Sequence, residues 1–136
     1  MSFSIDTRIL TTCIELAEWP LSSLFLKNNA DYPWLILVPR VKDVQEIYHL
    51  HPSLQYKLME EMSQLSSIVG HYFKPDKLNI GALGNIVPQL HVHIIARYKT
   101  DKLWPHGIWQ AGETTILYTK EQLSSLKQDL QILLTQ

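Results

Sequence analysis

Cysteine is almost absent from this 136-residue chain, in which Cys13 is the only one. A single thiol excludes a disulfide within the chain and a zinc site built on several cysteines. So little cysteine is typical of proteins that work in a reducing compartment. We therefore expect a cytoplasmic protein.

An excess of charge of either sign is also lacking. The chain has 12 lysine and arginine residues against 13 aspartate and glutamate residues, for a net charge of −1. A duplex DNA-binding protein must neutralise many phosphates at once, and this balance argues against that function. We expect no nucleic-acid partner, so any small anionic ligand must be bound by a few local groups.

Long apolar runs are missing as well. Nowhere do about 18 apolar residues, the length needed for a transmembrane helix, follow one another. A secretory signal has a positively charged segment followed by an apolar one. The first residues, MSFSIDTRIL, do not show this pattern. We expect a soluble, unprocessed protein with no membrane partner.

Repeats, low-complexity tracts and Gly/Ser linkers are absent, which predicts one domain over residues 1–136. Near its start, Asp6 is placed to cap a helix that ends at the EWP of residues 18–20. The apolar residues at helical spacing in this segment are Ile9, Leu10, Cys13, Leu16 and Ala17. Two apolar runs follow at residues 21–28 and 32–40, and the polar turn between them predicts a β-hairpin.

A long helix is predicted to begin at Pro52 and to end before Pro75. Its apolar stripe consists of Leu54, Leu58, Leu65, Ile68, Val69 and Tyr72. Glu60 and Glu61 lie outside this stripe, and we expect both to face water.

A second hairpin is predicted in residues 77–97, followed by a loop rich in glycine, proline and tryptophan. Thr119 and Gln122 have the spacing of a capping box at the start of a C-terminal helix. This order of elements predicts an α+β fold with an antiparallel sheet.

The second arm of this hairpin contains the sequence PQLHVHIIAR, residues 88–97. Gln89, His91 and His93 stand at every second position, with apolar residues between them. Because the side chains of a strand alternate between its faces, we expect these three to share one face while their neighbours enter the core. Ordinary polar residues on a solvated face are the simplest interpretation, but Ile95 on the same face is apolar, which argues against full solvation.

Two chemical interpretations of the histidine pair remain. Two imidazoles at positions i and i+2 of a strand chelate a divalent ion when a third ligand is available, and the HLH of residues 49–51 is one candidate. Alternatively, one neutral imidazole attacks a phosphorus atom while its neighbour donates a hydrogen bond or a proton to the phosphate or the leaving group. The spacing supplies the two nearby imidazoles that this second mechanism needs.

The motif QLHVHII resembles the signature of the histidine triad (HIT) family, in which histidines alternate with apolar residues. The segments LFLKN, YPWLILVPR and LNIG and the closing AR follow in the order typical of that family. The sequence is most similar to bacterial HIT hydrolases of the dinucleoside polyphosphate hydrolase type. The resemblance implies a HIT-like fold, with an antiparallel sheet of about five strands, a long helix packed on it and a C-terminal helix.

This resemblance implies a nucleotide hydrolase or transferase that acts at an α-phosphate, with dinucleoside polyphosphates as the expected substrates. His91, the middle position, is then the nucleophile that forms a transient nucleotidyl-histidine, and His93 contacts the phosphate or the leaving group. Gln89 replaces the first histidine of the family, and its amide orients a neighbour but does not exchange a proton near neutral pH. A further family histidine, early in the second strand, is replaced by Trp34 and Leu35.

The resemblance also assigns two asparagines to the substrate. Asn28 matches a family residue near the ribose, and Asn79 matches one near the phosphate. Their simpler alternatives are a polar residue at a hairpin end and one on an exposed strand face. No cofactor and no metal are expected, and the resemblance implies a homodimer.

Other contacts are suggested by residue type and position. Arg40 and Arg97 each close a strand and are candidates for a distal phosphate, although an arginine in that position is more often a solvated end. Trp104 and Trp109 lie in the loop after the histidine strand, where an aromatic ring stacks on a base or covers a small core of its own.

Three functions besides polyphosphate hydrolysis stay open. The first is a phosphoramidase that releases a nucleotide from an amine. The second is a nucleotide-binding protein without turnover, which the replacement at Gln89 favours. The third is a metal-dependent hydrolase built on His91 and His93.

Overall fold

A computed structural model describes residues 2–109 and 114–136. Within these residues, one antiparallel sheet has the strand order β1-β2-β3-β5-β4. The strands are β1 (Cys13–Glu18), β2 (Ser22–Lys27), β3 (Trp34–Pro39), β4 (Lys77–Gly81) and β5 (Val92–Arg97). The helices are α1 (Thr7–Leu10), the 3-10 turn η1 (Ile47–His49), α2 (Pro52–Phe73) and α3 (Lys120–Leu134). The predicted α+β fold, with its five-stranded antiparallel sheet, is confirmed.

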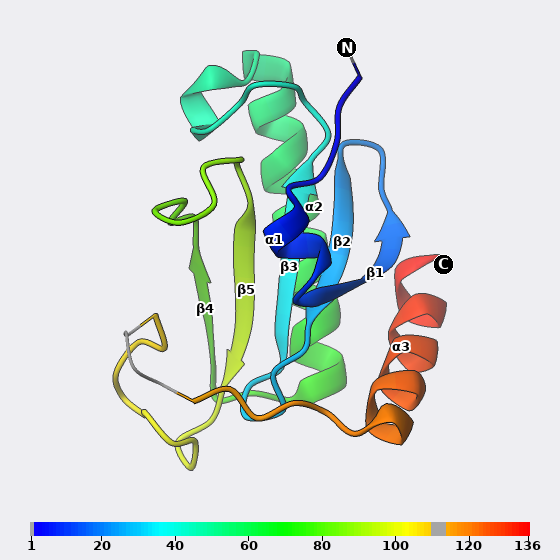
Figure 1. Ribbon diagram of the computed structural model, residues 1–136, viewed down its shortest axis with the longest axis vertical. Helices are drawn as coiled ribbons and strands as arrows, with labels where there is room; N and C mark the ends of the chain where they lie inside the picture. The colour runs from blue at the N-terminus through cyan, green and yellow to red at the C-terminus, as the bar shows by residue number, and fades with distance from the viewer. Residues whose placement is uncertain (1, 110–113) are drawn as a thin grey trace.

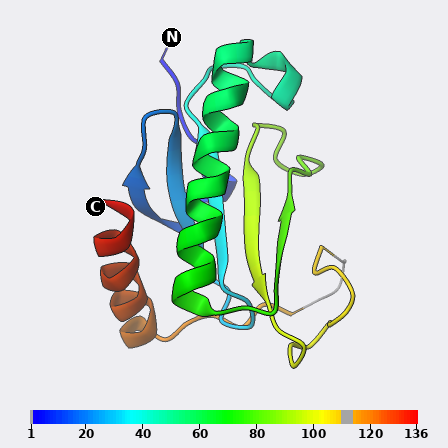
Figure 2. The same cartoon turned by 180° about the vertical axis from the view of Figure 1, so that it is seen from behind.

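The helices divide the two faces of the sheet between them. The long helix α2 runs across one face, which we call the helix face, and α3 lies beside β1 at the sheet edge (Figure 2). The short α1 lies across the other face, in front of β3 (Figure 1). We call this second face the histidine face, because the side chains of His91 and His93 lie on it.

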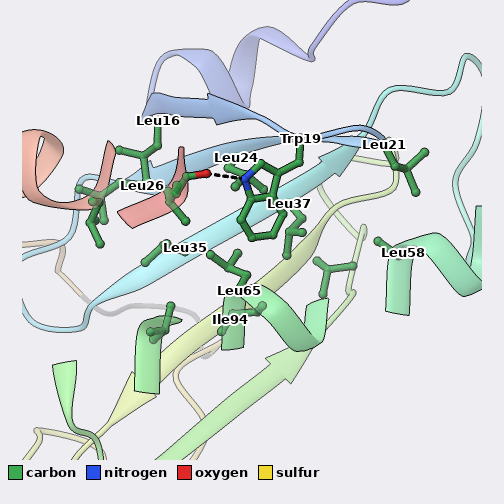
Figure 3. Packing of buried hydrophobic residues seen from close by; sticks show 14 of the residues in the cluster. Leu16, Trp19, Leu21, Leu24, Leu26, Leu35, Leu37, Leu58, Leu65 and Ile94 are labelled. Carbon is green, nitrogen blue, oxygen red and sulfur yellow. Dashed lines mark hydrogen bonds between the residues drawn. The ribbon is translucent and has the colours of Figure 1, made fainter. Parts of the chain in front are cut away.

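The main core fills the space between the sheet and α2 (Figure 3). Leu35 and Leu37 of β3 and Leu65 of α2 are fully buried there. The predicted stripe of α2 supplies Leu58, Leu65 and Val69 to this core. Trp19 packs in the same cluster, and its indole Nε1 donates to the carbonyl oxygen of Leu134, 2.8 Å away. This contact fastens the end of α3 to the sheet.

The predicted first helix is wrong beyond its first turn. Asp6 caps a helix by accepting from the backbone N–H of Arg8, as expected, but α1 ends at Leu10 and residues 13–18 form β1. The pairing of β1 with β2 shifts register between Glu15 and Ala17, which marks a β-bulge. Cys13 is buried in the cluster on the histidine face and Leu16 in the core on the helix face, so two buried residues stand three positions apart on a strand that is covered on both faces. That spacing imitates a helix.

The remaining elements agree with the sequence. The β2–β3 hairpin is present, and α2 begins at Pro52, with His51 as its cap. Lys74, just before Pro75, takes a left-handed conformation with φ of 50° and ends α2. Thr119 and Gln122 form the predicted capping box of α3. None of the helices in residues 2–109 and 114–136 combines the length and the hydropathy needed to cross a membrane.

Glu61 differs from its predicted exposure. It is only 2% exposed, whereas its neighbour Glu60 faces water. The Oε2 atom of Glu61 accepts a hydrogen bond of 2.9 Å from the backbone N–H of Leu21. This donor lies just before β2, so the carboxylate connects the middle of α2 to the start of the hairpin. Amphipathic spacing cannot reveal such a contact, because it depends on where the chain between β1 and β2 turns.

We expect Glu61→Ala to destabilise the protein by about 1–3 kcal/mol, since it leaves the buried N–H of Leu21 without an acceptor. Glu61→Gln keeps an acceptor oxygen at that point and should lose less. The free energy of unfolding in urea is the quantity to measure. Glu60→Ala on the same turn is the control and should change it by less than about 0.5 kcal/mol. Equal effects of Glu60→Ala and Glu61→Ala would contradict the assigned role.

Candidate functional site

Two imidazole rings lie side by side at the start of β5. His91 immediately precedes the strand and His93 lies within it, and each residue is 7% exposed. Their ring centroids are 4.8 Å apart in an edge-on arrangement. Leu90, Val92 and Ile94 enter the core on the helix face, so the predicted alternation of faces holds here.

The tautomer of His91 follows from its backbone partner. Its Nδ1 lies 2.6 Å from the carbonyl oxygen of Gln89. A carbonyl oxygen only accepts, so Nδ1 must hold a hydrogen atom and donate it. In the neutral ring this leaves the lone pair on Nε2. Because no described residue bonds to that atom, it is the nitrogen available to react with a ligand.

His93 has the opposite tautomer. Its Nδ1 lies 2.8 Å from the indole Nε1 of Trp34 on the neighbouring strand β3. An indole N–H only donates, so Nδ1 of His93 accepts, and the hydrogen of the neutral ring is on Nε2. The two adjacent rings thus offer a ligand different groups, a lone pair at His91 and an N–H at His93. This division of roles suits phosphoryl transfer to a nitrogen nucleophile, which needs a lone pair at one group and a hydrogen-bond donor for the phosphate at another.

The charge state of His93 is set by its surroundings. Burial, with smaller contributions from the nearby His91 and Lys27, lowers the pKa of its ring to about 3. A group with so low a pKa is uncharged throughout the physiological pH range. His93 therefore acts near neutral pH as a neutral hydrogen-bond donor.

Gln89 reaches the histidines through its backbone alone. Its side-chain Oε1 accepts from the backbone N–H of Asp6 at 2.9 Å, and its Nε2 donates to the carbonyl oxygen of Ser4 at 2.8 Å. The amide therefore fastens the segment before α1 to the histidine face. Because the carbonyl of Gln89 orients His91, a side chain other than histidine at this position preserves the tautomer of His91.

Trp109 covers one side of His93. Its ring centroid is 5.7 Å from that of His93 and 6.5 Å from that of Trp34. Gly81 of β4 is opposite His93 in the sheet, and a Cβ atom at Gly81 would lie 3.2 Å from the ring of Trp109. Glycine at this position thus leaves room for the indole. Trp109 packs against the buried cluster of the histidine face and also covers the candidate site, so both alternatives for this residue stay open.

Lys27 is a charged residue of this face that the sequence analysis did not single out. Its Nζ lies 5.1 Å from the ring centroid of Trp34, and no carboxylate of the described residues forms an ion pair with it. A cavity of about 140 Å³ lies beside it, lined by Asn29, Tyr32 and Ile108 among others. Lys27 ends the apolar run LFLK, and the alternation from Phe25 puts it on the histidine face. This alternation is the feature of the sequence from which the position of Lys27 could have been predicted.

The other predicted contacts are spread around the sheet. The Oδ1 atom of Asn28 accepts from the backbone N–H of Tyr118, 2.9 Å away, and so connects β2 to the segment before α3. The guanidinium of Arg40 donates to the carbonyl oxygens of Trp19 and Pro20. Neither residue forms a hydrogen bond with His91 or His93.

Arg97, Asn79 and Trp104 form a group of their own. Arg97 is 1% exposed, in contrast to the solvated end that a strand-closing arginine suggests. Its guanidinium donates to both carboxylate oxygens of Asp101 and, at 2.8 Å, to Oδ1 of Asn79. The ring centroid of Trp104 lies 5.9 Å from Cζ of Arg97. These contacts fasten the loop after β5 to the end of the sheet.

Metal coordination by the histidine pair lacks a third protein ligand in the described part of the chain. No group of three or more His, Cys, Asp or Glu side chains there has a geometry that could hold a metal ion. His49 and His51 are engaged at the entrance of α2, where His51 accepts from the backbone N–H of Ser53.

Comparisons with known proteins place these features in a family. The model of the HIT domain matches residues 12–100. A histidine triad protein of Marinobacter aquaeolei is 41% identical, with a TM-score of 0.94, and the match covers 99% of this chain and 98% of that one. One of Bradyrhizobium japonicum is 39% identical, with a TM-score of 0.92 and coverage of 97% and 98%. One of Sinorhizobium meliloti is 34% identical, with a TM-score of 0.90 and coverage of 94% of each chain. No curated protein matches the sequence.

Proposed function

This chain belongs to the HIT family, whose members are generally nucleotide hydrolases and transferases, and we propose that it hydrolyses dinucleoside polyphosphates at the α-phosphate through a nucleotidyl-His91 intermediate. The observation that carries the proposal is the pair of opposite tautomers. His91 keeps a lone pair on Nε2, and His93 keeps an N–H on Nε2 beside it.

The proposed reaction has two steps. First, the lone pair on Nε2 of His91 forms a bond to the α-phosphorus, the bond from phosphorus to the bridging oxygen breaks, and the polyphosphate leaves with that electron pair. Second, water attacks the phosphorus, the phosphorus–nitrogen bond breaks, and the nucleoside monophosphate and a proton are released. The N–H of His93 donates a hydrogen bond to a phosphate oxygen in both steps.

The remaining assignments complete the proposal. Asn28, Asn79, Arg40 and Trp104 stay candidates for substrate contacts that form only with the ligand bound. Residues 1–136 are proposed to be one domain that acts as a homodimer in the cytoplasm. A nucleotide-binding role without turnover is the alternative that the missing first histidine suggests. The backbone contact of Gln89 weakens this alternative, because it orients His91 without any help from the side chain at position 89.

To test this, the protein is mixed with diadenosine tetraphosphate, the reaction is quenched within milliseconds without acid, and the mass of the intact protein is measured by mass spectrometry. We expect a protein species heavier by one adenylate, together with release of ATP first and AMP second. The reaction should persist when a chelator removes metal bound to the protein and Mg²⁺ is then restored for the substrate alone. Binding of AMP without adduct or product would contradict the proposed hydrolysis. Loss of activity that only a transition metal restores would indicate a metal enzyme.

A further inference from the structure

The partner of His93 bears on which leaving groups the site releases. We propose that Trp34 is a positioning residue that holds the proton of His93 on Nε2, so that the site releases leaving groups that depart as anions, such as polyphosphates, in preference to amines. This inference rests on the proposed transfer of the nucleotide to His91, and it selects between the two substrate classes that the histidine pair allows.

The first step of the argument is the chemistry of the contact. The indole of Trp34 has one polar atom, an N–H that never accepts and does not titrate in the physiological range. It donates to Nδ1 of His93 over 2.8 Å, and both residues are only 7% exposed. Protonation of Nδ1 would turn two N–H groups toward each other in a buried place. His93 can become an imidazolium only by losing this hydrogen bond.

The titratable groups around His93 act in the same direction, because a positive charge on either of them opposes a second one on the His93 ring. Lys27 of β2 and His91 beside β5 both oppose a positive charge on the ring. From β3 and β4, the facing residues are Trp34 and Gly81, and Trp109 covers the ring from the loop; none of these three carries a charge. In the described part of the chain, no carboxylate acts on His93 to stabilise an imidazolium. The burial that lowers the ring pKa to about 3 agrees with this arrangement.

The leaving group then depends on whether a proton is available. When His91 attacks an anhydride, the bridging oxygen departs with its electron pair as a polyphosphate anion, which is stable near neutral pH without a proton. When His91 attacks a phosphoramidate, the departing nitrogen must take up a proton as the phosphorus–nitrogen bond breaks, because an amide anion is far too basic to leave. A neutral His93 donates a hydrogen bond but has no acidic proton to give.

Gln89 and Trp34 both orient a histidine of the site without being able to supply a proton. Gln89 replaces the first histidine of the family, and Trp34 is one of the two residues found where a further family histidine is absent; neither Gln89 nor Trp34 exchanges a proton near neutral pH. Gln89 orients His91 through its carbonyl, and Trp34 orients His93 through its indole. The two replacements together preserve the geometry of two oriented imidazoles while removing two titratable groups. Both residues therefore orient an imidazole without supplying a proton.

The experiment compares two substrates on the purified protein, diadenosine tetraphosphate and an N-alkyl phosphoramidate of AMP. For the wild type, we expect kcat/KM for the polyphosphate to exceed that for the phosphoramidate by about 10²-fold or more. In Trp34→Phe, which keeps an aromatic ring but removes the N–H, this ratio should fall at least about tenfold. Trp34→His, which restores a titratable ring, should lower the ratio further by raising phosphoramidate turnover.

A second readout, ¹⁵N NMR of the histidine rings, separates positioning from mere packing. His93 of the wild type should show the Nε2–H tautomer with no titration from about pH 5 to about pH 8, whereas in Trp34→Phe it should titrate or exchange between tautomers. Trp19→Phe removes an equivalent buried indole hydrogen bond on the helix face and should alter neither the tautomer nor the substrate ratio. The NMR measurement on the wild type stands even if a Trp34 variant does not fold.

The outcomes distinguish this inference from the proposed function. A wild type that turns over both substrates equally well keeps the function and overturns the preference. The leaving-group preference is also overturned, and the function kept, if Trp34→Phe leaves the ratio of the two kcat/KM values unchanged. The same holds if His93 titrates near neutral pH in the wild type. A wild type that forms no adduct with either substrate overturns the function and the leaving-group preference together.

Discussion

His91→Ala should lower the rate of diadenosine tetraphosphate hydrolysis by about 10⁴-fold or more, and it should abolish the adenylated protein species. The reason is the lone pair on Nε2 of His91, which no described neighbour replaces. His93 cannot take over as the nucleophile, because its Nε2 carries the hydrogen and its Nδ1 is occupied by Trp34. Steady-state release of ATP and the intact mass of the quenched protein are the quantities to measure.

Two further variants make this test specific. His91→Asn is closer to the imidazole in size and should be equally inactive, which excludes a cavity as the cause of the loss. His71→Ala removes an exposed histidine of α2, on the other side of the sheet, and should leave the rate unchanged. Nucleotide binding by His91→Asn should persist, since the residues proposed for the other substrate contacts are unchanged. Turnover by His91→Asn above about one hundredth of the wild-type rate would contradict a covalent mechanism.

The sequence was sufficient to predict a structural feature where that feature depends on one residue type or on one repeat of apolar positions. The stripe of α2, the capping box at Thr119 and the alternation around His91 and His93 depend on neighbours within a few positions. Each of these features appears in the structure as predicted. The motif QLHVHII also identified the family, because the segments around it follow in the order typical of that family.

The sequence misled where a strand that is buried on both faces imitates another period. Cys13 is buried on the histidine face and Leu16 on the helix face, and their three-residue spacing is also the mark of a helix. The decision between the two depends on β2, which pairs with this segment along its whole length. No pattern within residues 6–18 contains that information.

The residues of the candidate site were predictable from the sequence, but most of their hydrogen-bond partners were not. Gln89 and Trp34 were visible as replacements for histidines, yet their roles follow only from contacts across the fold. The carbonyl of Gln89 faces His91, and the indole of Trp34 faces His93 from another strand. Lys27 was missed because the run at residues 21–28 was interpreted only as an apolar arm of a hairpin, and the faces of its side chains were not assigned.

Arg97 and Asp101 give the largest stability effect that we expect. The side chains of this pair are 2% and 4% exposed, and the guanidinium meets the two carboxylate oxygens at 2.7 and 2.9 Å. Asp101→Ala removes the anion and leaves a buried cation with Asn79 as its remaining partner, along with two backbone donors, Tyr98 and Trp104, that lose their acceptor. We expect a loss of about 3–5 kcal/mol in the free energy of unfolding.

The pH dependence of that loss has a definite sign. The hydrogen bonds from Arg97, as the main cause, hold the pKa of the Asp101 carboxyl below its ordinary value of 3.8. A lowered pKa in the folded state stabilises the protein fully above the unfolded value, and this contribution is lost as the pH falls through the folded value. Urea unfolding at about pH 7 should therefore show the full difference between wild type and Asp101→Ala, and strongly acidic conditions should reduce it.

The double variant Arg97→Met with Asp101→Ala separates the unpaired cation from the other losses. It should be more stable than Asp101→Ala alone, because no buried charge is left without a partner. Asp31→Ala breaks the more exposed pair with Lys102 and should cost at most about 1 kcal/mol. If Asp101→Ala is no worse than Asp31→Ala, the charges of Arg97 and Asp101 are solvated in solution. The segment from Tyr98 to Trp109 is then not fastened to β5 by this ion pair. In that case the ring of Trp109 is held over His93 by its own packing on Trp34 and Gly81.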